Sequence, residues 1–572
     1  MYVLEQRLVK TFILIVVMFI LLFLKLAGIQ IIQGDYLAQK AVQLNAREVP
    51  LEEFCRGEIT DRHGHPLAGG GTEGRLVLFP ALIQDKENMA SQLKSIVPGE
   101  FNFQLLLAGD PAIIPARLTP PQEAALKNLG HPGVMVLPVY LRYGSSPLAV
   151  HLSGHLSKAT PAGGVLDVKR PGGWYGALGL ERYYDQELAG QRAKTFARVY
   201  VDAMGRLVGS APEVITRAKK DPGRQHVITT IDKEIQHIVE DVMDARVPLG
   251  AVVVMDARTG DLLAAASRPA FNPHPMAIGP ALALDTEVFV DQSTALFQPG
   301  SIFKLVVAAA ALEEGLVTSG TVFQCNGSAG PLISCWHGPG HGQITLEEAF
   351  TLSCNPTFAQ LGLQLGADKL IAYARAFGLD NQEIIGYPVP VDPRQDLSLI
   401  GAGYHLVNSS VGQGPVLTTP VQIAAMMNVV VNSGVYLQPR LVKELRNDSS
   451  EIVTRFPHGP SKKVISSYTA ARLKNMLETA AATGVGSHAF IPVYGSGGKT
   501  GSAQVSGDGG SINAWFAGYA PQARPRYVVV VLVRDGKSGG QTAAPVFREI
   551  TEAILTNLQN YENEPVKLIV RG

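Results

Sequence analysis

Three short groups of residues in this sequence have the types and the spacing that acyl transfer by a serine requires. Such a reaction needs a hydroxyl within reach of a base, donors for the developing oxyanion and groups that hold the substrate. Ser301 and Lys304 are three positions apart, so on a helix they share one face. A neutral lysine could accept the hydroxyl proton if its pKa falls well below its usual value of about 10.4.

The other two groups follow later in the chain. Ser353-Cys354-Asn355 is predicted at a loop break after a helix, and Lys499-Thr500-Gly501, followed by Ser502, is predicted on a strand. Lys499 is a candidate for the neighbouring cation that would lower the pKa of Lys304. Each pattern is short enough to recur by chance, so order and context carry the argument.

Several decoys match the same spacings. They are Ser91/Lys94, Ser496/Lys499, Ser511/Asn513 and Lys537/Ser538. Ser91 lies in a polar stretch and is predicted to be a solvated helix position. Spacing alone therefore does not separate these decoys from the three groups.

Gly498-Lys499-Thr500 also resembles the end of a phosphate-binding loop. That loop requires an earlier glycine, and the required position is Val493, while the residues after Thr500 continue as a strand. The same test rejects Gly536-Lys537-Ser538, where the position is Val531. Nucleotide binding is therefore excluded for both segments.

A cluster of sulfur and nitrogen ligands could bind zinc. Cys325, Cys335, His337 and His341 lie close together in the sequence, but their spacings match no closed zinc site, so we interpret them as an incidental loop. Cys325 and Cys335 could instead close one loop as a disulfide, although four cysteines in 572 residues do not make a disulfide framework. No metal and no cofactor is expected.

Net charge and chain length limit the kinds of partner and the number of domains that this protein can have. Lys plus Arg and Asp plus Glu both number 49, so no basic excess indicates nucleic acid as a partner. A chain of 572 residues exceeds one ordinary domain, and two or three are expected.

The N-terminal region predicts a membrane anchor. Residues 11–29 form an apolar run with Lys25 as its only charge, close to the roughly 20 residues that span a bilayer. Arg7 and Lys10 precede it and favour a cytoplasmic N-terminus. A cleaved signal peptide is the alternative, but no small-x-small cleavage site follows the run. We therefore expect a single-pass protein whose remaining chain lies outside the cytoplasm.

The rest of the chain divides near residue 247. Residues 35–240 are mixed and punctuated by glycine and proline, whereas residues 250–267 read as a β-hairpin. Helices are predicted at 301–315, 345–366, 367–377, 419–433 and 544–559, and strands at 499–505, 512–520 and 526–534. The simplest arrangement is one sheet that combines the strands at 250–267 with those near the C-terminus, with the intervening helices packed on it.

In these motifs and in longer segments the sequence resembles a class B penicillin-binding protein. The segments are FCRGEITDRHGHPLA (54–68), GALGLERYYDQELAG (176–190), GAVVVMDARTGDLLAAASRPAFNP (250–273), QPGSIFK (298–304), VGQGPVLTTPVQIAAMMNVVVNSG (411–434) and NAWFAGYAP (513–521). The resemblance implies an α+β fold: an antiparallel sheet flanked by helices, on an elongated N-terminal pedestal with one transmembrane helix. Its expected divisions are 1–34 (tail and anchor), 35–245 (pedestal), 246–560 (transpeptidase) and 561–572 (tail). The one departure, Cys354 in place of Asp, leaves the role of that position little affected.

The resemblance also implies a mechanism. Ser301 would attack the penultimate D-alanine carbonyl of a peptidoglycan stem peptide, Lys304 would act as the first base, and an amine from a neighbouring stem would resolve the acyl-enzyme. Ser353, held by Lys304 and Lys499, would relay a proton to the leaving amine, and Asn355 would orient Lys304.

Substrate binding follows from the same resemblance. The backbone N–H groups of Ser301 and Ser502 would hold the oxyanion, and Thr500 and Ser502 would bind the terminal carboxylate beside Lys499. Gly501 would leave the strand open for substrate. β-Lactam antibiotics would acylate Ser301.

Rival functions share the fold. They are a β-lactam sensor, a β-lactamase, and a non-catalytic wall-assembly scaffold, but no group that activates water for deacylation is identified in the sequence. The acidic motifs of a glycosyltransferase are not found in residues 35–240. By resemblance, that region would dock a polytopic glycan polymerase and other wall-synthesis proteins.

Overall fold

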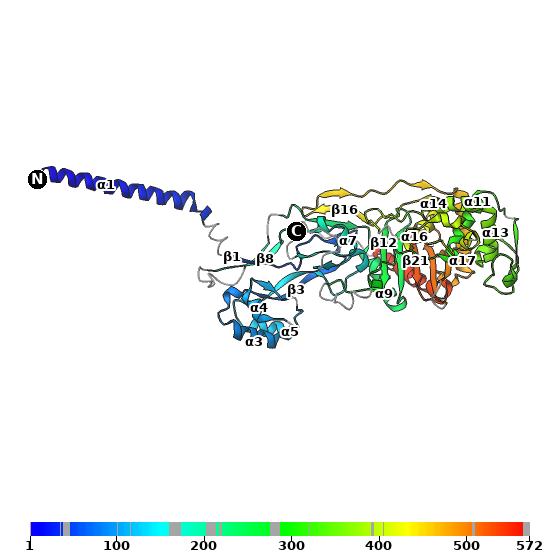
Figure 1. The fold of residues 1–572 in the computed structure, drawn as a ribbon, viewed down its shortest axis with the longest axis horizontal. Coiled ribbons are helices and arrows are strands. Elements are labelled where there is room, and N and C mark those ends of the chain that lie inside the picture. The colour runs from blue at the N-terminus through cyan, green and yellow to red at the C-terminus, as the bar shows by residue number, and fades with distance from the viewer. Residues whose placement is uncertain are drawn as a thin grey trace. The chain divides into compact units, whose positions relative to one another are not determined.

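The computed structural model divides into two compact units. Unit 1 comprises residues 1–55, 71–142 and 192–220, and unit 2 comprises residues 56–70, 143–191 and 221–572. The residues whose structure is described are 2–34, 36–37, 46–99, 101–114, 116–158, 173–201, 213–216, 220–274, 286–318, 320–389, 394–403, 405–505 and 510–563. The chain thus leaves and re-enters unit 2 twice before the long C-terminal part (Figure 1).

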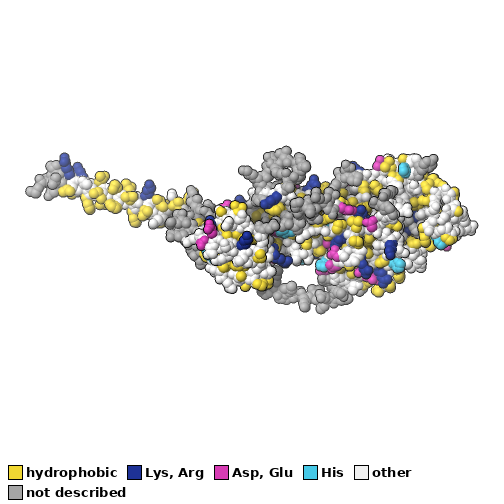
Figure 2. Space-filling model, turned by 60° about the horizontal axis from the view of Figure 1, so that its bottom comes forward, with side chains coloured by type: hydrophobic (Ala, Val, Ile, Leu, Met, Phe, Trp, Pro, Cys, Tyr) yellow, Lys and Arg dark blue, Asp and Glu magenta, His cyan; other side chains and the backbone are white. Residues whose placement is uncertain are grey.

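A long apolar helix begins the chain. α1 (Tyr2–Ala27) continues into a π-helical turn (Gly28–Ile32), and the candidate membrane span is Gln6–Ile32, with a mean hydropathy of 3.0 and no buried part. Figure 2 shows hydrophobic side chains along its surface. The predicted apolar span is therefore a helix long enough to cross a bilayer.

Unit 1 combines small sheets with short helices. One sheet has the order β1 (Ala46–Pro50), β8 (Thr195–Tyr200), β9 (Glu213–Thr216), and another has the order β4 (Ala112–Ile113), β3 (Gly69–Leu78), β5 (Val134–Tyr143). The helices α3 (Lys86–Ile96), α4 (Phe103–Ala108) and α5 (Pro120–Asn128) pack with the second sheet around a core that contains Leu76, Leu93 and Leu126. The N-cap carboxylate of Asp85 accepts from the N–H of Asn88 and fixes where α3 begins.

The centre of unit 2 is a five-stranded antiparallel sheet. Its order is β12 (Leu262–Arg268), β11 (Gly250–Asp256), β21 (Tyr527–Val533), β20 (Ile512–Ala520), β19 (Gly497–Gln504). β11 lies between β12 and β21, with Val253 opposite Ala265 on one side and Val530 on the other. Strands from both ends of the domain sequence therefore pair directly, as the sequence predicts.

Helices cover both faces of this sheet. Val252 and Val254 pack in one core cluster with α9 (Lys233–Arg246) and α18 (Ala544–Asn563), whereas Val253 and Met255 pack in another with α11 (Lys304–Glu313), α16 (Pro420–Val431) and α17 (Ser467–Ala482). Successive side chains of a strand point to opposite faces, so a sheet covered twice needs continuous apolar strands. This explains the run YVVVVLV in β21.

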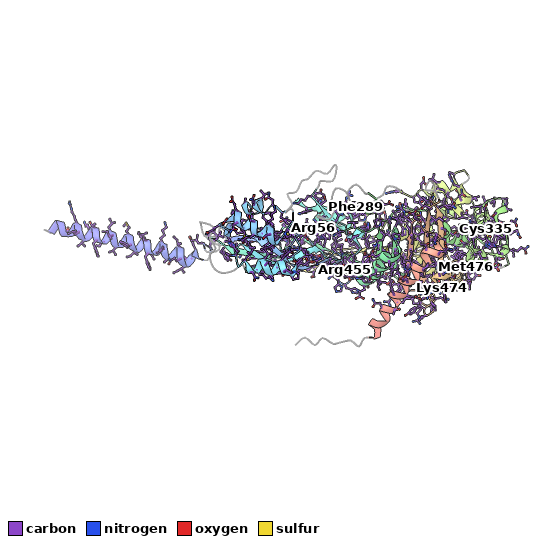
Figure 3. The ribbon with its side chains drawn as sticks, turned by 90° about the horizontal axis from the view of Figure 1, so that it is seen from below. Arg56, Phe289, Cys335, Arg455, Lys474 and Met476 are labelled. Atoms are coloured by element: carbon purple, nitrogen blue, oxygen red, sulfur yellow. The ribbon has the colours of Figure 1, made fainter. Side chains whose placement is uncertain are left out.

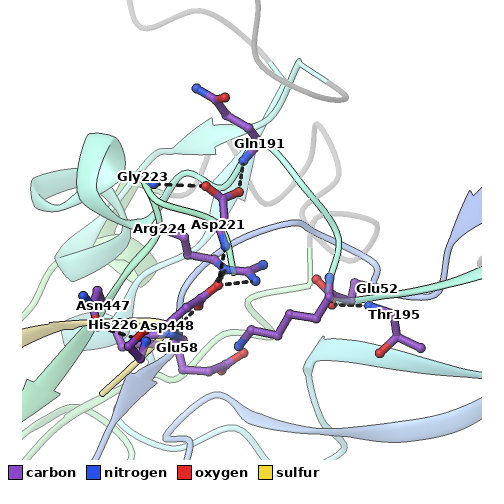
Figure 4. Close-up of polar contacts among 12 residues, drawn as sticks. Glu52, Glu58, Gln191, Thr195, Asp221, Gly223, Arg224, His226, Asn447 and Asp448 are labelled. Carbon is purple, nitrogen blue, oxygen red and sulfur yellow. Dashed lines mark hydrogen bonds and ion pairs between the residues drawn. The ribbon is translucent and has the colours of Figure 1, made fainter. Parts of the chain in front are cut away.

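A second sheet of unit 2 has the order β17 (Ile452–Arg455), β16 (Val442–Asn447), β10 (Gln225–Thr229), β2 (Ile59–Thr60). A buried polar cluster lies beside it (Figure 4). Asp448 accepts from Arg224 (Nη2 to Oδ2, 2.8 Å) and contacts His226 Nε2 at 2.9 Å, and its Oδ2 also accepts from the Asp221 N–H. These bonds tie the segment before β10 to the turn after β16.

Two predicted helices have interruptions in the structure. The predicted helix 345–366 is two helices, α12 (Leu346–Thr351) and α13 (Asn355–Leu365), because Ser353 adopts a left-handed conformation with φ of 55° between them. The predicted helix 301–315 begins as a 3-10 turn, Gly300–Phe303, before α11. Both interruptions fall on the residues that could do chemistry. The predicted helices at 367–377 and 419–433 correspond to α14 (Ala367–Ala376) and α16.

Candidate active site

Ser301 lies in the 3-10 turn that precedes α11, and its position depends on two glycines. Gly300 has a φ of +55°, and its N–H donates to the carbonyl of Gly412 at 2.9 Å. A Cβ on Gly412, whose φ is +75°, would clash with the Gly300 carbonyl. Only glycine allows this close backbone approach, which holds the start of the turn. The Ser301 side chain is half-buried.

Lys304 is fully buried at the start of α11 and bonds to the turn between α12 and α13. Its Nζ donates to the carbonyl oxygen of Ser353 at 2.8 Å, to the hydroxyl of Ser353 at 3.3 Å and to Oδ1 of Asn355 at 2.7 Å. The left-handed turn at Ser353 is what presents both oxygens to one amine. The first and second motifs are therefore joined directly.

Lys499 reaches the same hydroxyl from β19. Its Nζ donates to Ser353 Oγ at 3.0 Å and to the carbonyl oxygen of Thr500 at 3.3 Å, and the side chain is fully buried. Ser353 Oγ thus lies between two amines from segments nearly two hundred residues apart.

Burial changes the protonation of both lysines. Desolvation lowers the pKa of Lys304 to about 7. Desolvation, and then the charge of Lys304, lower the pKa of Lys499 well below its ordinary value. Aromatic rings supply part of the apolar wall: Phe358 lies 5.4 Å from Lys304 Nζ and Phe350 lies 5.7 Å from Lys499 Nζ. A neutral amine next to a serine hydroxyl is the state that proton transfer needs.

The start of α11 also packs against β19. A Cβ on Gly501 would clash with the carbonyl oxygen of Pro299, and a Cβ on Gly300 would lie 3.0 Å from the backbone nitrogen of Ser502. The segment that carries Ser301 therefore lies against the third motif. Gly501 is required for this packing between turn and strand, a reason that sequence reasoning did not supply.

The remaining third-motif residues differ in exposure. Thr500 is buried, whereas Ser502 is exposed. The hydroxyl of Ser502 accepts from the N–H of Gly539 at 3.0 Å, and the amide of Gln413 donates to the Ser502 carbonyl at 3.4 Å. Sequence reasoning missed Gln413, Gly539, Phe350 and Phe358 as parts of the site, because none of them has a distinctive spacing.

The decoys lie in other surroundings. Ser91 is exposed on α3 in unit 1, and Ser496 donates to the Ala489 carbonyl at 2.9 Å. Ser511 bonds to the Asp535 carboxylate. Hydrogen bonds instead join Lys304, Ser353, Asn355 and Lys499. The turn that carries Ser301 packs, through Pro299 and Gly300, against Gly501 and Ser502 of β19.

Comparison with known protein families shows to which family this chain belongs. Residues 250–552 match the penicillin binding protein transpeptidase domain, and residues 53–225 match the penicillin-binding protein dimerisation domain. The chain belongs to the class B penicillin-binding proteins. It is an enzyme of the peptidoglycan D,D-transpeptidase family, with the expected combination of a transpeptidase domain and an N-terminal dimerisation domain.

Individual relatives agree with this membership. The chain is 29% identical to stage V sporulation protein D of Bacillus subtilis, over 97% of this chain and 86% of that protein. It is 31% identical to the peptidoglycan D,D-transpeptidase PbpA of Mycolicibacterium smegmatis, over 67% of this chain and 80% of that protein. A solved structure described as a peptidoglycan synthase complex that coordinates polymerization and crosslinking matches 98% of this chain, with a TM-score of 0.69 and 25% identity.

Proposed function

We propose that this protein is a membrane-anchored serine D,D-transpeptidase that cross-links peptidoglycan stem peptides through an acyl-enzyme on Ser301. The main observation behind this proposal is that two buried amines, from Lys304 and Lys499, both bond to the hydroxyl of Ser353. This hydroxyl belongs to the same site as the Ser301 turn. A site with two low-pKa lysines can take a proton from a nucleophile and return it to a leaving group.

In the first half-reaction, Lys304 accepts the proton of Ser301 as its oxygen attacks the carbonyl of the penultimate D-alanine. Ser353 then passes a proton to the departing amine of the terminal D-alanine. The protonated amine of Lys304, which bonds to Ser353 Oγ, restores the Ser353 hydroxyl and becomes neutral again, while Lys499 holds Ser353 Oγ from the other side. Asn355 keeps the Lys304 amine in place through its Oδ1. An amine of a second stem peptide attacks the ester in the second half-reaction and releases Ser301.

Two backbone N–H groups stabilise the negative oxygen of each tetrahedral intermediate. They belong to Ser301 and Ser502, and support comes from the close packing of Gly300 on the Ser502 backbone. Thr500 and Ser502 bind the terminal carboxylate, and Lys499 adds positive charge when it is protonated.

Covalent labelling by a penicillin tests the nucleophile. A fluorescent penicillin should label the full-length protein, and Ser301→Ala should abolish labelling while the protein stays folded. Ser91→Ala, which alters the Ser-x-x-Lys decoy on α3, is the matched control and should label normally. Labelling of a folded Ser301→Ala protein would refute the assignment.

Turnover separates the rival functions. A transpeptidase or a receptor keeps the penicilloyl group for hours, whereas a β-lactamase releases it rapidly. Formation of cross-linked product from a donor peptide ending in D-Ala-D-Ala and an acceptor amine then separates the transpeptidase from a sensor or a scaffold. A stable adduct without any cross-linked product would contradict the proposal.

We also infer that unit 2 lies outside the cytoplasm and that the protein works beside a polytopic glycan polymerase. Support comes from the basic residues before the span and from the match to a peptidoglycan synthase complex. Protease added outside spheroplasts should digest the domain. Affinity purification of the full chain in mild detergent should recover such a polymerase, and recovery of none would count against the partnership.

A further inference from the structure

A cavity of about 410 Å³ lies in unit 2. Its walls come from α6 (Val150–Ser153), α7 (Gly179–Tyr183), the segment 289–296 and the loop 382–389. Figure 3 labels Phe289, one of the wall residues. The described wall residues include none of the groups assigned to acyl transfer. A cavity of this size can hold a small ligand, so its walls indicate what that ligand would be.

One carboxylate at the cavity wall has a buried oxygen without a hydrogen-bond donor. Oδ1 of Asp291 accepts from the Ser293 N–H at 3.0 Å, from the Ser293 hydroxyl at 2.6 Å and from the Ser267 hydroxyl at 3.0 Å. Oδ2 of Asp291 is buried and accepts no hydrogen bond from the residues that the structure describes. A buried acceptor without a donor is costly. A ligand that donates a hydrogen bond to this carboxylate would therefore be stabilised.

Aromatic rings form another part of the wall. Tyr183 and Tyr387 meet edge to face, with ring centroids 5.3 Å apart, and Phe289 lines the same cavity. Tyr387 is buried and Tyr183 is half-buried. A cation is attracted to the faces of aromatic rings, and this attraction is stronger where water is excluded. The rings therefore favour a positively charged ligand with an apolar stem.

The charge of Asp291 acts on the other titratable groups of the wall. Burial raises the pKa of Tyr387, and the negative charge of Asp291 raises it further. Burial lowers the pKa of His151 against the effect of Asp291, so this histidine is neutral near neutral pH, and its Nε2 lies 2.9 Å from the Val288 carbonyl. Arg182 also lines the cavity, but it is exposed and does not bond to Oδ2 of Asp291. Within the described residues, the carboxylate thus has no hydrogen bond from a cation.

We propose that this cavity binds a primary ammonium group carried on a short carbon chain. The ammonium donates charge-assisted hydrogen bonds to the carboxylate of Asp291, and its carbon chain packs on the aromatic rings. A quaternary ammonium has no N–H to donate and should bind weakly. The ammonium belongs either to a free diamine or to a lysine-type side chain of a peptide. The site is additional to the proposed acyl transfer and does not depend on it.

The cavity adjoins the segment that leads to Ser301. Its wall includes Leu296, and the next residue, Phe297, exchanges two backbone hydrogen bonds with Thr418, at 2.9 Å and 2.8 Å. These bonds fix the chain between the cavity and the turn that carries Ser301. A ligand in the cavity should therefore bind equally well to the free and to the acylated enzyme.

Titration of the full-length protein in detergent with cadaverine, followed by saturation-transfer NMR, tests the proposal. Cadaverine should bind saturably, whereas the neutral diol of the same chain length and tetramethylammonium should not. Asp291→Asn retains an oxygen for the serine donors but removes the charge, so it should weaken cadaverine binding by about tenfold or more. Arg182→Gln should bind cadaverine at least as tightly as wild type. Asp241→Asn, which alters an exposed carboxylate, is the matched control and should bind normally.

A second titration identifies the source of the ammonium. Nα-acetyl-lysine methylamide carries the same ammonium group on a peptide backbone. Tighter binding of this compound than of cadaverine assigns the cavity to a peptide side chain, and tighter binding of cadaverine assigns it to a free diamine.

Three outcomes would overturn the proposal. The first is wild-type protein that binds cadaverine no more tightly than the diol, a result that requires no variant to fold. The second is unchanged cadaverine binding by a folded Asp291→Asn protein. The third is loss of cadaverine binding after saturating acylation with a penicillin, which would place the amine in the acyl-transfer site. Penicillin labelling of Ser301 is scored separately, so failure of the ammonium site and failure of the acyl-transfer assignment are distinguishable.

Discussion

Lys304 has no charged partner among the atoms that hold it: its amine bonds to two oxygens of Ser353 and one of Asn355. Burial therefore dominates its protonation and lowers its pKa to about 7. Cys354 and Cys335 oppose this shift and raise the pKa of Lys304, whereas the charge of Lys304 lowers the pKa of Lys499. Without such burial, a lysine with a pKa near neutral pH would be unusual.

The rate of acylation by a penicillin should consequently depend on pH. The amine of Lys304 must be neutral to accept the proton of Ser301, so acylation should rise with pH through a midpoint of about 7. Stopped-flow or quenched labelling between mildly acidic and mildly alkaline pH measures the profile. A rate that stays flat up to the ordinary lysine range would contradict a lowered pKa.

Asn355→Asp should move that profile upward. The substitution places a carboxylate where Oδ1 now lies 2.7 Å from the Lys304 amine, and an opposite charge at that distance favours protonated lysine. We expect the midpoint to rise by about one unit or more and the rate at neutral pH to fall. Asn475→Asp, an exposed position on α17, is the control and should leave the profile unchanged.

Elements position the site through close backbone contacts. The 3-10 turn before α11 lies against β19 at Gly501, where only hydrogen fits below the Pro299 carbonyl. The indole of Trp515 on β20 donates to the Gln298 carbonyl at 3.0 Å and holds the preceding residues. Turn and strand therefore act as one unit in presenting Ser301 and Ser502.

Gly501→Ala should separate these two elements. The added methyl group should lower the free energy of unfolding by about 1–3 kcal/mol, the usual cost of overpacking, and should slow acylation because the Ser502 backbone shifts. Thermal melting and penicillin labelling measure the two effects. Gly320→Ala adds the same methyl group where nothing lies within 4 Å, and it should behave as wild type.

The sheet that contains β10 and β16 depends on one buried carboxylate. Asp448→Asn would remove the carboxylate charge that pairs with Arg224, whose side chain is 1% exposed, and breaking such a buried pair costs about 3 kcal/mol or more. The melting temperature of unit 2 should fall by several degrees. Asp241→Asn alters an exposed pair with His237 and should cause little change; equal losses in both variants would argue against a special role for the buried pair.

At the scale of the whole molecule, the apolar helix belongs to unit 1, whereas the candidate catalytic residues belong to unit 2. No part of its candidate span is buried, so its apolar surface needs a bilayer or detergent. Deletion of residues 2–32 should release the protein from the membrane fraction and leave the penicillin acylation rate constant unchanged. Loss of acylation in a folded deletion variant would show that the helix contributes to the site.

Much of the architecture was predictable because it depends on local pattern. The hairpin β11–β12, the strands β20 and β21 and the closing helix α18 follow from runs of apolar residues and their turns. The sequence also predicts the break at Ser353, but the contact of that turn with Lys304 depends on tertiary structure, since the Ser353 carbonyl and hydroxyl accept from the Lys304 amine.

The sequence by itself determined the chemical groups of this protein: the apolar span, the sheet strands, and the Ser-x-x-Lys, Ser-x-Asn and Lys-Thr-Gly motifs that mark the family. Only the tertiary structure decided which groups meet. It joined Lys304 and Lys499 on one hydroxyl, and it added Cys354 to a cysteine cluster from which His337 is absent. The physical reason is that residues distant in sequence are brought together by packing of the core, which no short spacing records.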